Sequence, residues 1–167
     1  MRNTFDRFNG RHQDYQAARP SYAQEFLDWL GELYAPPERY TAADIGSGTG
    51  KLSAQLLAAG FRVCGVEPNP DMRGAAEALL GGDPRFSSSN GTDHDTGLPD
   101  RSVDMVAAAQ AFHWFDGPAF ARECRRILRP GGRAVLVWNV RGSAPVNQAL
   151  AQVFREHCPS FHGFTGG

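Results

Sequence analysis

The sequence predicts an α/β fold built as an open, doubly wound, mostly parallel sheet of about five strands, with helices on both faces. Short strand-like runs alternate with helix-like segments about five times along the 167 residues. A glycine-rich loop follows the first strand-like run, at the edge where such sheets bind their ligands. The content of 41% hydrophobic and 21% charged residues suffices for one packed core without disulfides. We therefore expect a single domain over residues 1–167.

Helices are predicted where apolar residues recur at helical spacing between capping and helix-breaking residues. Residues 1–20 lack this spacing and are expected to form an irregular N-terminal arm. Ser21 and Gln24 have the spacing of a capping box, which predicts Ser21 as the N-cap of the first helix. Asn69 and Asp116 precede prolines that suit a first helical turn. The predicted helices span 22–34, 51–59, 70–80, 117–128 and 143–157.

Strands are predicted where short apolar runs lie between turn residues. The run at 85–90 contains three consecutive serines, which favours a sheet edge. The run at 134–138 is the clearest strand, and Pro130, Gly131 and Gly132 are expected to separate it from the preceding helix. The predicted strands span 40–45, 61–66, 85–90, 103–109 and 134–138.

Charge and composition exclude several classes of protein. The net charge of −1 argues against a partner bound through bulk positive charge, so no nucleic acid is expected. No apolar run approaches the roughly 20 residues of a membrane helix, and the N-terminus lacks the apolar core of a secretory signal. The three cysteines are too few and too scattered for a disulfide framework. These features predict a cytoplasmic protein with reduced thiols and no membrane partner.

The glycine-rich loop is the first candidate binding site. Gly46, Gly48 and Gly50 occupy every second position between a strand and a helix. Glycine permits a tight turn with positive φ and lets a ligand lie against bare main chain, while the N–H groups of the helix start point toward it. Such a loop alone is a weak signal, because a glycine-rich turn without a ligand has the same appearance.

Two acidic residues define the chemistry of this site. Glu67 follows Gly46 by 21 positions, at the end of the second strand, where a carboxylate can accept both hydroxyls of a ribose. Asp44 directly precedes the loop, where a negative charge would repel a pyrophosphate but suit an ammonium or a sulfonium group. Lys51 stands where a dinucleotide fold has its third glycine. The pattern therefore argues against NAD and against a phosphate-binding P-loop.

Five motifs follow one another along the chain: Asp44–Gly50, Val66–Asn69, Gly91–Asp104, Ala109–Asp116 and Leu128–Gly132. Together, in this order, they resemble the type 11 branch of the class I S-adenosylmethionine (SAM)-dependent methyltransferases, and Arg19–Tyr22 resembles the arm of that branch. The resemblance implies a Rossmann-like sheet ordered 3-2-1-4-5, SAM as cofactor, S-adenosylhomocysteine as product and a small-molecule acceptor of the methyl group.

The resemblance places one group of residues along the methionine and ribose of SAM. Asp44 is expected near the methionine end. The main chain of Gly46, Ser47 and Gly48 is expected along the methionine and ribose, and Glu67 at the ribose hydroxyls.

A second group matches positions near the adenine. Pro68 and Met72 are expected beside the ring, and Thr92 and Asp93 at its amino group. Here the chain departs from the family, because Asp93 and His94 replace the usual Ala-Glu.

Three further residues match or adjoin the site. Gln110 is expected on the methionine side. Arg19 either reaches the SAM carboxylate or is a solvated residue before a helix. His113 is the candidate general base, needed only if the acceptor must lose a proton. The alternative is a structural histidine packed beside Trp114.

The C-terminal part is shorter than the family fold, which ends in two more strands forming an antiparallel hairpin. Only 29 residues follow Trp138, so the hairpin is expected to be missing and 141–167 to be a truncated C-terminal helix and tail, in a fragment or a natural short form. The fifth strand would then be an exposed edge and a candidate surface for self-association.

Other functions remain open at this point. A SAM-binding module without turnover is the main alternative, because the acceptor side borrows from the missing part. A nicotinamide-dependent oxidoreductase and a protein or nucleic-acid methyltransferase fit the motifs less well. No metal is expected, since His157, Cys158 and His162 match no standard zinc spacing. The basic helix face formed by Arg122, Arg125, Arg126 and Arg129 is interpreted as solvated and balanced by nearby acids.

Overall fold

The computed structural model describes residues 21–139. The chain divides into two compact units, Met1–Val137 and Trp138–Gly167. The helices and strands described below all lie in the first unit. The predicted helix at 143–157 and the candidate residue Arg19 lie outside the described residues.

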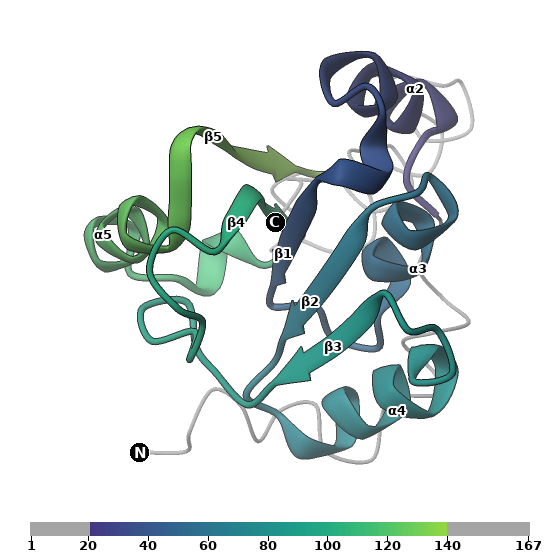
Figure 1. Cartoon of the computed structure of the whole chain (residues 1–167). Coiled ribbons are helices and arrows are strands. Elements are labelled where there is room, and N and C mark those ends of the chain that lie inside the picture. Colours follow the sequence, from purple (N-terminus) through teal and green to yellow (C-terminus); the bar gives the residue numbers. More distant parts are fainter. Residues whose placement is uncertain (1–20, 140–167) are drawn as a thin grey trace, which may run out of the picture. The chain divides into compact units, whose positions relative to one another are not determined.

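A five-stranded sheet forms the centre of this unit, and all its neighbouring strands are parallel (Figure 1). The order is β3-β2-β1-β4-β5, as the sequence predicted. Central β1 pairs with both β2 and β4, so the carboxyl ends of three strands meet at one edge of the sheet. The strands are β1 Thr41–Ile45, β2 Arg62–Val66, β3 Phe86–Ser89, β4 Val103–Ala109 and β5 Leu128–Val137.

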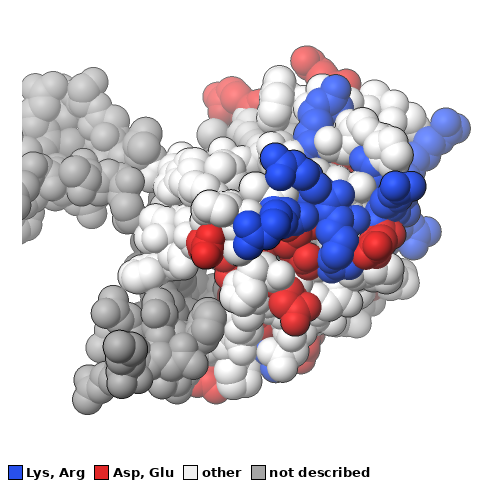
Figure 2. All heavy atoms as spheres, turned by 90° about the vertical axis from the view of Figure 1, so that its left-hand side faces the viewer, with Lys and Arg blue, Asp and Glu red and all other residues white. Residues whose placement is uncertain are grey.

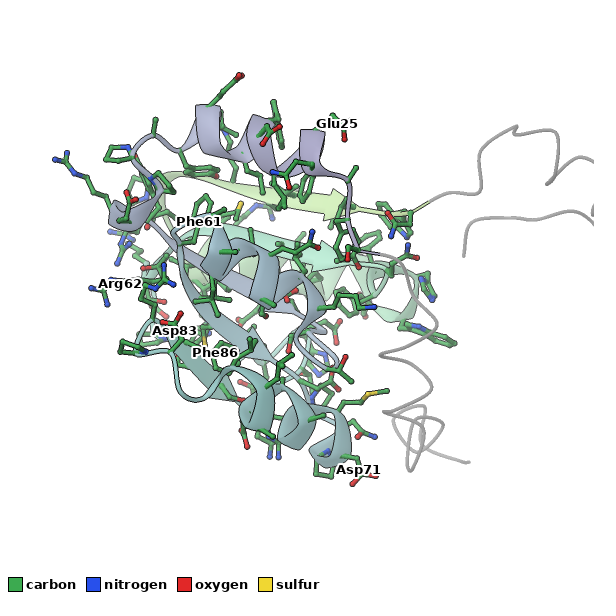
Figure 3. All side chains as sticks on the ribbon, turned by 90° about the vertical axis from the view of Figure 1, so that its right-hand side faces the viewer. Glu25, Phe61, Arg62, Asp71, Asp83 and Phe86 are labelled. Carbon is green, nitrogen blue, oxygen red and sulfur yellow. The ribbon has the colours of Figure 1, made fainter. Side chains whose placement is uncertain are left out.

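Helices cover both faces of this sheet. They are α2 Gln24–Leu33, α3 Lys51–Ala58, α4 Pro70–Leu80 and α5 Gly117–Ile127, with short 3-10 turns η2 Pro37–Arg39 and η3 Phe112–Trp114. Figure 3 looks onto the face that carries α2, α3 and α4, and α5 lies on the other face in Figure 1. Each helix of residues 21–139 is too short or too polar to span a lipid bilayer.

Two apolar cores follow from the alternation of side chains along the strands. Ala42 of β1 packs toward α2 and α3 in a core that includes Leu30, Leu56 and Phe61. Its neighbour Ala43 points to the opposite core. The second core joins β1, β2 and β4 to α5 through Ala43, Ile45, Val66, Val103, Val106, Ala108, Phe120, Cys124 and Ile127. Because both faces of β1 are buried, its side chains are fixed on both sides of the sheet.

The predicted caps of α4 and α5 are confirmed, and the predicted cap of α2 is wrong. Asn69 accepts hydrogen bonds from the N–H groups of Asp71 and Met72, and Asp116 accepts one from Ala119. The first helix instead begins after Ala23, with no side-chain cap. The reason is a distant contact: the main-chain N–H and carbonyl of Tyr22 both bond the amide of Gln55, at 3.0 Å each, which keeps Tyr22 out of the helix.

Strand β5 begins earlier than predicted. Leu128 already pairs with Val103, directly at the end of α5, and Arg133 pairs with Met105. The predicted break at residues 130–132 thus lies within the bounds of β5, as an irregularity of register. Gly131 has a φ of +83° there.

Basic residues gather over α5 and β5, with acidic residues among them (Figure 2). Arg126 bonds Asp100 and Glu123, each at 2.7 Å, and Arg129 bonds Asp104 at 2.7 Å. For Arg126 and Arg129 the predicted balance by nearby acids is confirmed.

Candidate functional site

The carboxyl ends of β1 and β2 bring the glycine loop and the second-strand motif together. The N–H groups of Gly46 and Ser47 donate to the carbonyl of Val66, at 2.8 and 3.2 Å. The loop therefore turns directly over the end of β2. This places Asp44, near the end of β1, and Glu67, just after β2, at the same edge of the sheet.

Asp44 is a buried carboxylate with one oxygen unsatisfied. It is only 1% exposed. Its Oδ2 accepts a 2.7 Å hydrogen bond from the hydroxyl of Ser53 on α3, whereas Oδ1 has no hydrogen-bond partner. Burial raises the pKa of Asp44 to about 6; the hydrogen bonds from Ser53 oppose this rise, and the charge of Glu67 adds to it. A buried, unpaired oxygen of this kind is costly unless a partner binds it.

Glu67 holds the glycine loop and the start of α4 in place. It is 9% exposed. Its Oε2 accepts a hydrogen bond from the N–H of Gly48, and its Oε1 accepts one from the N–H of Asn69, both at 2.9 Å. Burial raises the pKa of Glu67, and these two hydrogen bonds oppose the rise. Each carboxylate oxygen accepts more than one hydrogen bond, so Glu67 keeps capacity for the hydroxyls of a ligand.

The three loop glycines have different surroundings. A Cβ on Gly46 would lie 2.7 Å from the Cβ of Ala111, so this position is closed by packing against the segment after β4. A Cβ on Gly50 would lie 2.9 Å from Cδ1 of Leu80 on α4. A Cβ on Gly48 would meet no atom within 4 Å, although its φ of +56° favours glycine. Gly48 is therefore the loop glycine that faces open space.

The predicted adenine residues lie on two separate segments. Pro68 is half-buried, and Met72 is buried in the first turn of α4. Thr92 closes a local turn, because its hydroxyl accepts from the N–H of Asp95 at 3.1 Å. Asp93 accepts a 3.1 Å hydrogen bond from the N–H of Asp116, the N-cap of α5. Asp93 is thus already engaged in holding its own segment.

The segment after β4 begins with a strained residue. Gln110 is half-buried and has a φ of +59°, a left-handed conformation that is uncommon outside glycine and often marks functional sites. Its N–H donates to the carbonyl of Val137 at 3.0 Å, which ties this turn to the end of β5.

His113 lies farther along this segment, in η3. Its ring is exposed and packs on Trp114, with a centroid distance of 4.8 Å. This contact with Trp114 is the packing that the structural alternative predicted. Neighbouring Phe112 and Phe115 pack against Phe120 of the core, with ring-centroid distances of 5.7 and 5.1 Å.

Sequence reasoning missed two residues that shape the site. Ser53 orients Asp44, and the available signal was a hydroxyl among the buried apolar positions of α3. Glu123 is buried on α5 between Phe120 and Ile127, and the available signal was an acid on an apolar helical stripe. Neither signal identifies the partner, because the partner is set by tertiary packing.

The donor set fits a ligand that is cationic at one end and carries hydroxyls at the other. The unpaired Oδ1 of Asp44 suits an ammonium or sulfonium group, and Glu67 suits a pair of hydroxyls. Both properties belong to SAM.

Comparison with known proteins agrees with this chemistry. Residues 43–136 match the family model described as a methyltransferase domain. The chain is 42% identical over 127 residues to an uncharacterized methyltransferase of Mycobacterium bovis, covering 76% of this chain and 49% of that protein. It is 32% identical over 145 residues to one of Schizosaccharomyces pombe, covering 86% and 57%.

A solved structure shows the same fold. A protein of Anaeromyxobacter dehalogenans, described as a type II methyltransferase, aligns with a TM-score of 0.63 and 35% identity, covering 84% of this chain and 57% of that one. The chain spans about half the length of the curated relatives it matches. With its motifs, its fold and its matched family model, the chain belongs to the class I SAM-dependent methyltransferases.

Proposed function

We propose that this chain binds SAM at the carboxyl edge of its sheet and serves the transfer of the methyl group to a small-molecule acceptor. The observation that carries the proposal is the buried, unpaired Oδ1 of Asp44 beside a second buried carboxylate, Glu67. Two close carboxylates repel each other, and a cationic ligand relieves both the repulsion and the unsatisfied oxygen. A pyrophosphate, as in NAD, would add to the repulsion.

The protein's contribution to the reaction is binding and alignment. SAM, when bound, would supply the methyl group: the S–CH3 electron pair would stay on the sulfur of S-adenosylhomocysteine, and a lone pair of the acceptor would form the new bond. Asp44 and Glu67 hold the donor at its cationic and hydroxyl ends, and Gln110 lies on the methionine side. Alignment of this kind supplies several kcal/mol of a transfer barrier.

His113 is proposed as a base only for acceptors that must lose a proton. Its exposed ring, packed on Trp114, supports an auxiliary role rather than a role in holding SAM. Replacement by alanine should leave SAM affinity unchanged, and it should slow turnover only for acceptors that are protonated at the working pH.

Two proposals concern location and assembly. The buried free thiols of Cys64 and Cys124 support a reducing compartment such as the cytoplasm. Strand β5 ends the described sheet, and Leu136 on it is 39% exposed, which supports self-association along this edge. Light scattering of the protein and of Leu136→Lys tests the second proposal, since a monomeric wild-type chain would contradict it.

Calorimetric titration tests the binding proposal. SAM, S-adenosylhomocysteine and NAD are titrated into the wild-type chain, Asp44→Asn, Glu67→Gln and a control, Glu32→Gln, which removes an exposed acid of α2. The site variants should weaken SAM binding about 5- to 100-fold, as expected when a buried polar partner is lost. The control should bind as the wild type does. Unchanged affinity in both site variants, or binding of NAD but not of SAM, would overturn the proposal.

Turnover is measured separately from binding. Formation of S-adenosylhomocysteine is followed with small molecules that carry hydroxyl, amine or thiol nucleophiles. Product formation with one of them supports the enzyme. Tight SAM binding without product from any of them favours the alternative, a SAM-binding module without turnover.

A further inference from the structure

The segment between β3 and β4 carries Thr92 and Asp93 but contains no helix or strand. Its first part folds back on itself. A Cβ on Gly91 would collide with the carbonyl oxygen of Thr96, so the main chain passes close to Thr96 and closes a small loop. From the strand side, the hydroxyl of Ser89 donates to the same carbonyl at 2.7 Å. Thr92 and Asp93 therefore form the tip of a loop whose base is Thr96.

Thr96 is fixed in turn by a carboxylate of α5. It is 1% exposed, and both its N–H and its hydroxyl donate to Oε1 of Glu123, at 2.9 and 2.6 Å. The two residues are 27 positions apart, so this contact joins the loop before β4 to α5, the helix that follows β4 in the chain.

Glu123 is itself held rigidly. It is 7% exposed and lies on the apolar side of α5. Arg126, one turn later, donates from Nε to Oε2 at 2.8 Å and from Nη2 to Oε1 at 2.7 Å. The same guanidinium bonds Asp100 at 2.7 Å, at the far end of the segment. These contacts hold the pKa of Glu123 down at about 2, so the carboxylate stays charged.

A second tie links the tip of the loop to the same helix. Oδ2 of Asp93 accepts from the N–H of Asp116, which caps the start of α5. Helix α5 thus fixes the base of the loop through Glu123 and its tip through Asp116. Neither Glu123 nor Thr96 belongs to the residues expected to touch the cofactor.

We propose that Glu123 is a positioning residue: through Thr96 it sets the place of Thr92 and Asp93, and thereby the selectivity of the site for the amino group of adenine. This inference rests on the proposed function, since it assumes that the nucleoside of SAM lies against Thr92 and Asp93. Helix α5 would then contribute to the recognition of adenine through the loop that it holds.

The test compares two nucleosides that differ at one group. S-Inosylhomocysteine carries a carbonyl where S-adenosylhomocysteine carries the adenine amino group. Both are titrated into the wild type, Glu123→Gln and Thr96→Val, with Thr96→Ser as the conservative variant that keeps the hydroxyl. The wild type should prefer the adenine compound about tenfold or more, as expected when a hydrogen-bonded amino group is replaced. In Glu123→Gln and Thr96→Val this preference should fall below about threefold. Thr96→Ser, which keeps the hydroxyl, should keep the wild-type preference.

A matched control separates positioning from stability. Asp104, at the start of β4, also accepts from a distant main-chain N–H, that of Thr41 at 2.8 Å, and from an arginine, Arg129 at 2.7 Å. It lies at the opposite edge of the sheet. Asp104→Asn should lower the melting temperature as the Glu123 variant does, yet keep the wild-type preference for adenine.

The outcomes distinguish the inference from the function on which it rests. Wild-type preference retained in both Glu123→Gln and Thr96→Val overturns the positioning role alone. Loss of preference in Asp104→Asn to the same degree also overturns it, because any destabilisation would then suffice. A wild-type chain that binds neither compound overturns the proposed function as well.

Discussion

Lowering the pH from 7 to 5 should weaken the binding of SAM about tenfold through the protonation of Asp44. With a pKa of about 6 in the free protein, the carboxyl is about 90% ionised at pH 7 and about 10% ionised at pH 5. The ligand keeps its charge over this range, because the sulfonium is permanent and an α-amino group loses its proton only near pH 8. If only the ionised carboxyl binds, the affinity falls about tenfold, or about 1.4 kcal/mol.

Titration calorimetry at pH 5, 6 and 7, at constant ionic strength, measures this dependence. Asp44→Asn should bind more weakly and with nearly constant affinity, which separates Asp44 from Glu67, whose pKa is also raised. Glu32→Gln should retain the wild-type dependence. S-Adenosylhomocysteine lacks the sulfonium, so a dependence that persists with it assigns Asp44 to the ammonium end. A wild-type affinity that changes less than twofold between pH 7 and 5 would refute the reasoning.

Three further predictions concern stability. Asp44→Asn should raise the free energy of unfolding of the ligand-free protein by about 1–3 kcal/mol at pH 7, because it removes a buried charge; urea unfolding measures this. In acid titrations, the stability that Glu123 contributes should be complete above its unfolded pKa of 4.5 and disappear as the pH falls through about 2, so wild type and Glu123→Gln converge. Gly74→Ala, exposed within α4, should stabilise by about 0.5–1 kcal/mol, whereas Gly91→Ala should destabilise by forcing Thr96 to move; melting curves compare them.

Local signals predicted the parts of the fold that local chemistry determines. Asn69 and Asp116 cap their helices as expected, because the side chain and the N–H groups it bonds lie within three residues. The serine-rich edge strand β3 also follows from composition. The Ser21 cap failed because Gln55, 33 residues from Tyr22, holds the main chain there.

The candidate site divides in the same way. Asp44 lies near the end of β1 and Glu67 just after β2, so parallel pairing alone predicts that they lie at one edge of the sheet. The hydrogen bonds to them, and the bond between Thr96 and Glu123, depend on how helices settle on the sheet. No spacing rule encodes that arrangement. The charged groups of the site could therefore be predicted from the sequence, but the neighbouring residues that orient them could not.

The different surroundings of the loop glycines bear on how related chains diverge. A side chain at position 46 would push the glycine loop away from the segment after β4, whether or not a nucleoside is bound. A related chain that keeps Gly46 therefore shows only that this packing is kept. Gly48 borders free space, and a residue that tolerates left-handed backbone, such as asparagine, can replace it without collision. In a related protein that has lost methyltransferase activity, we therefore expect substitutions at position 48 and a glycine at position 46.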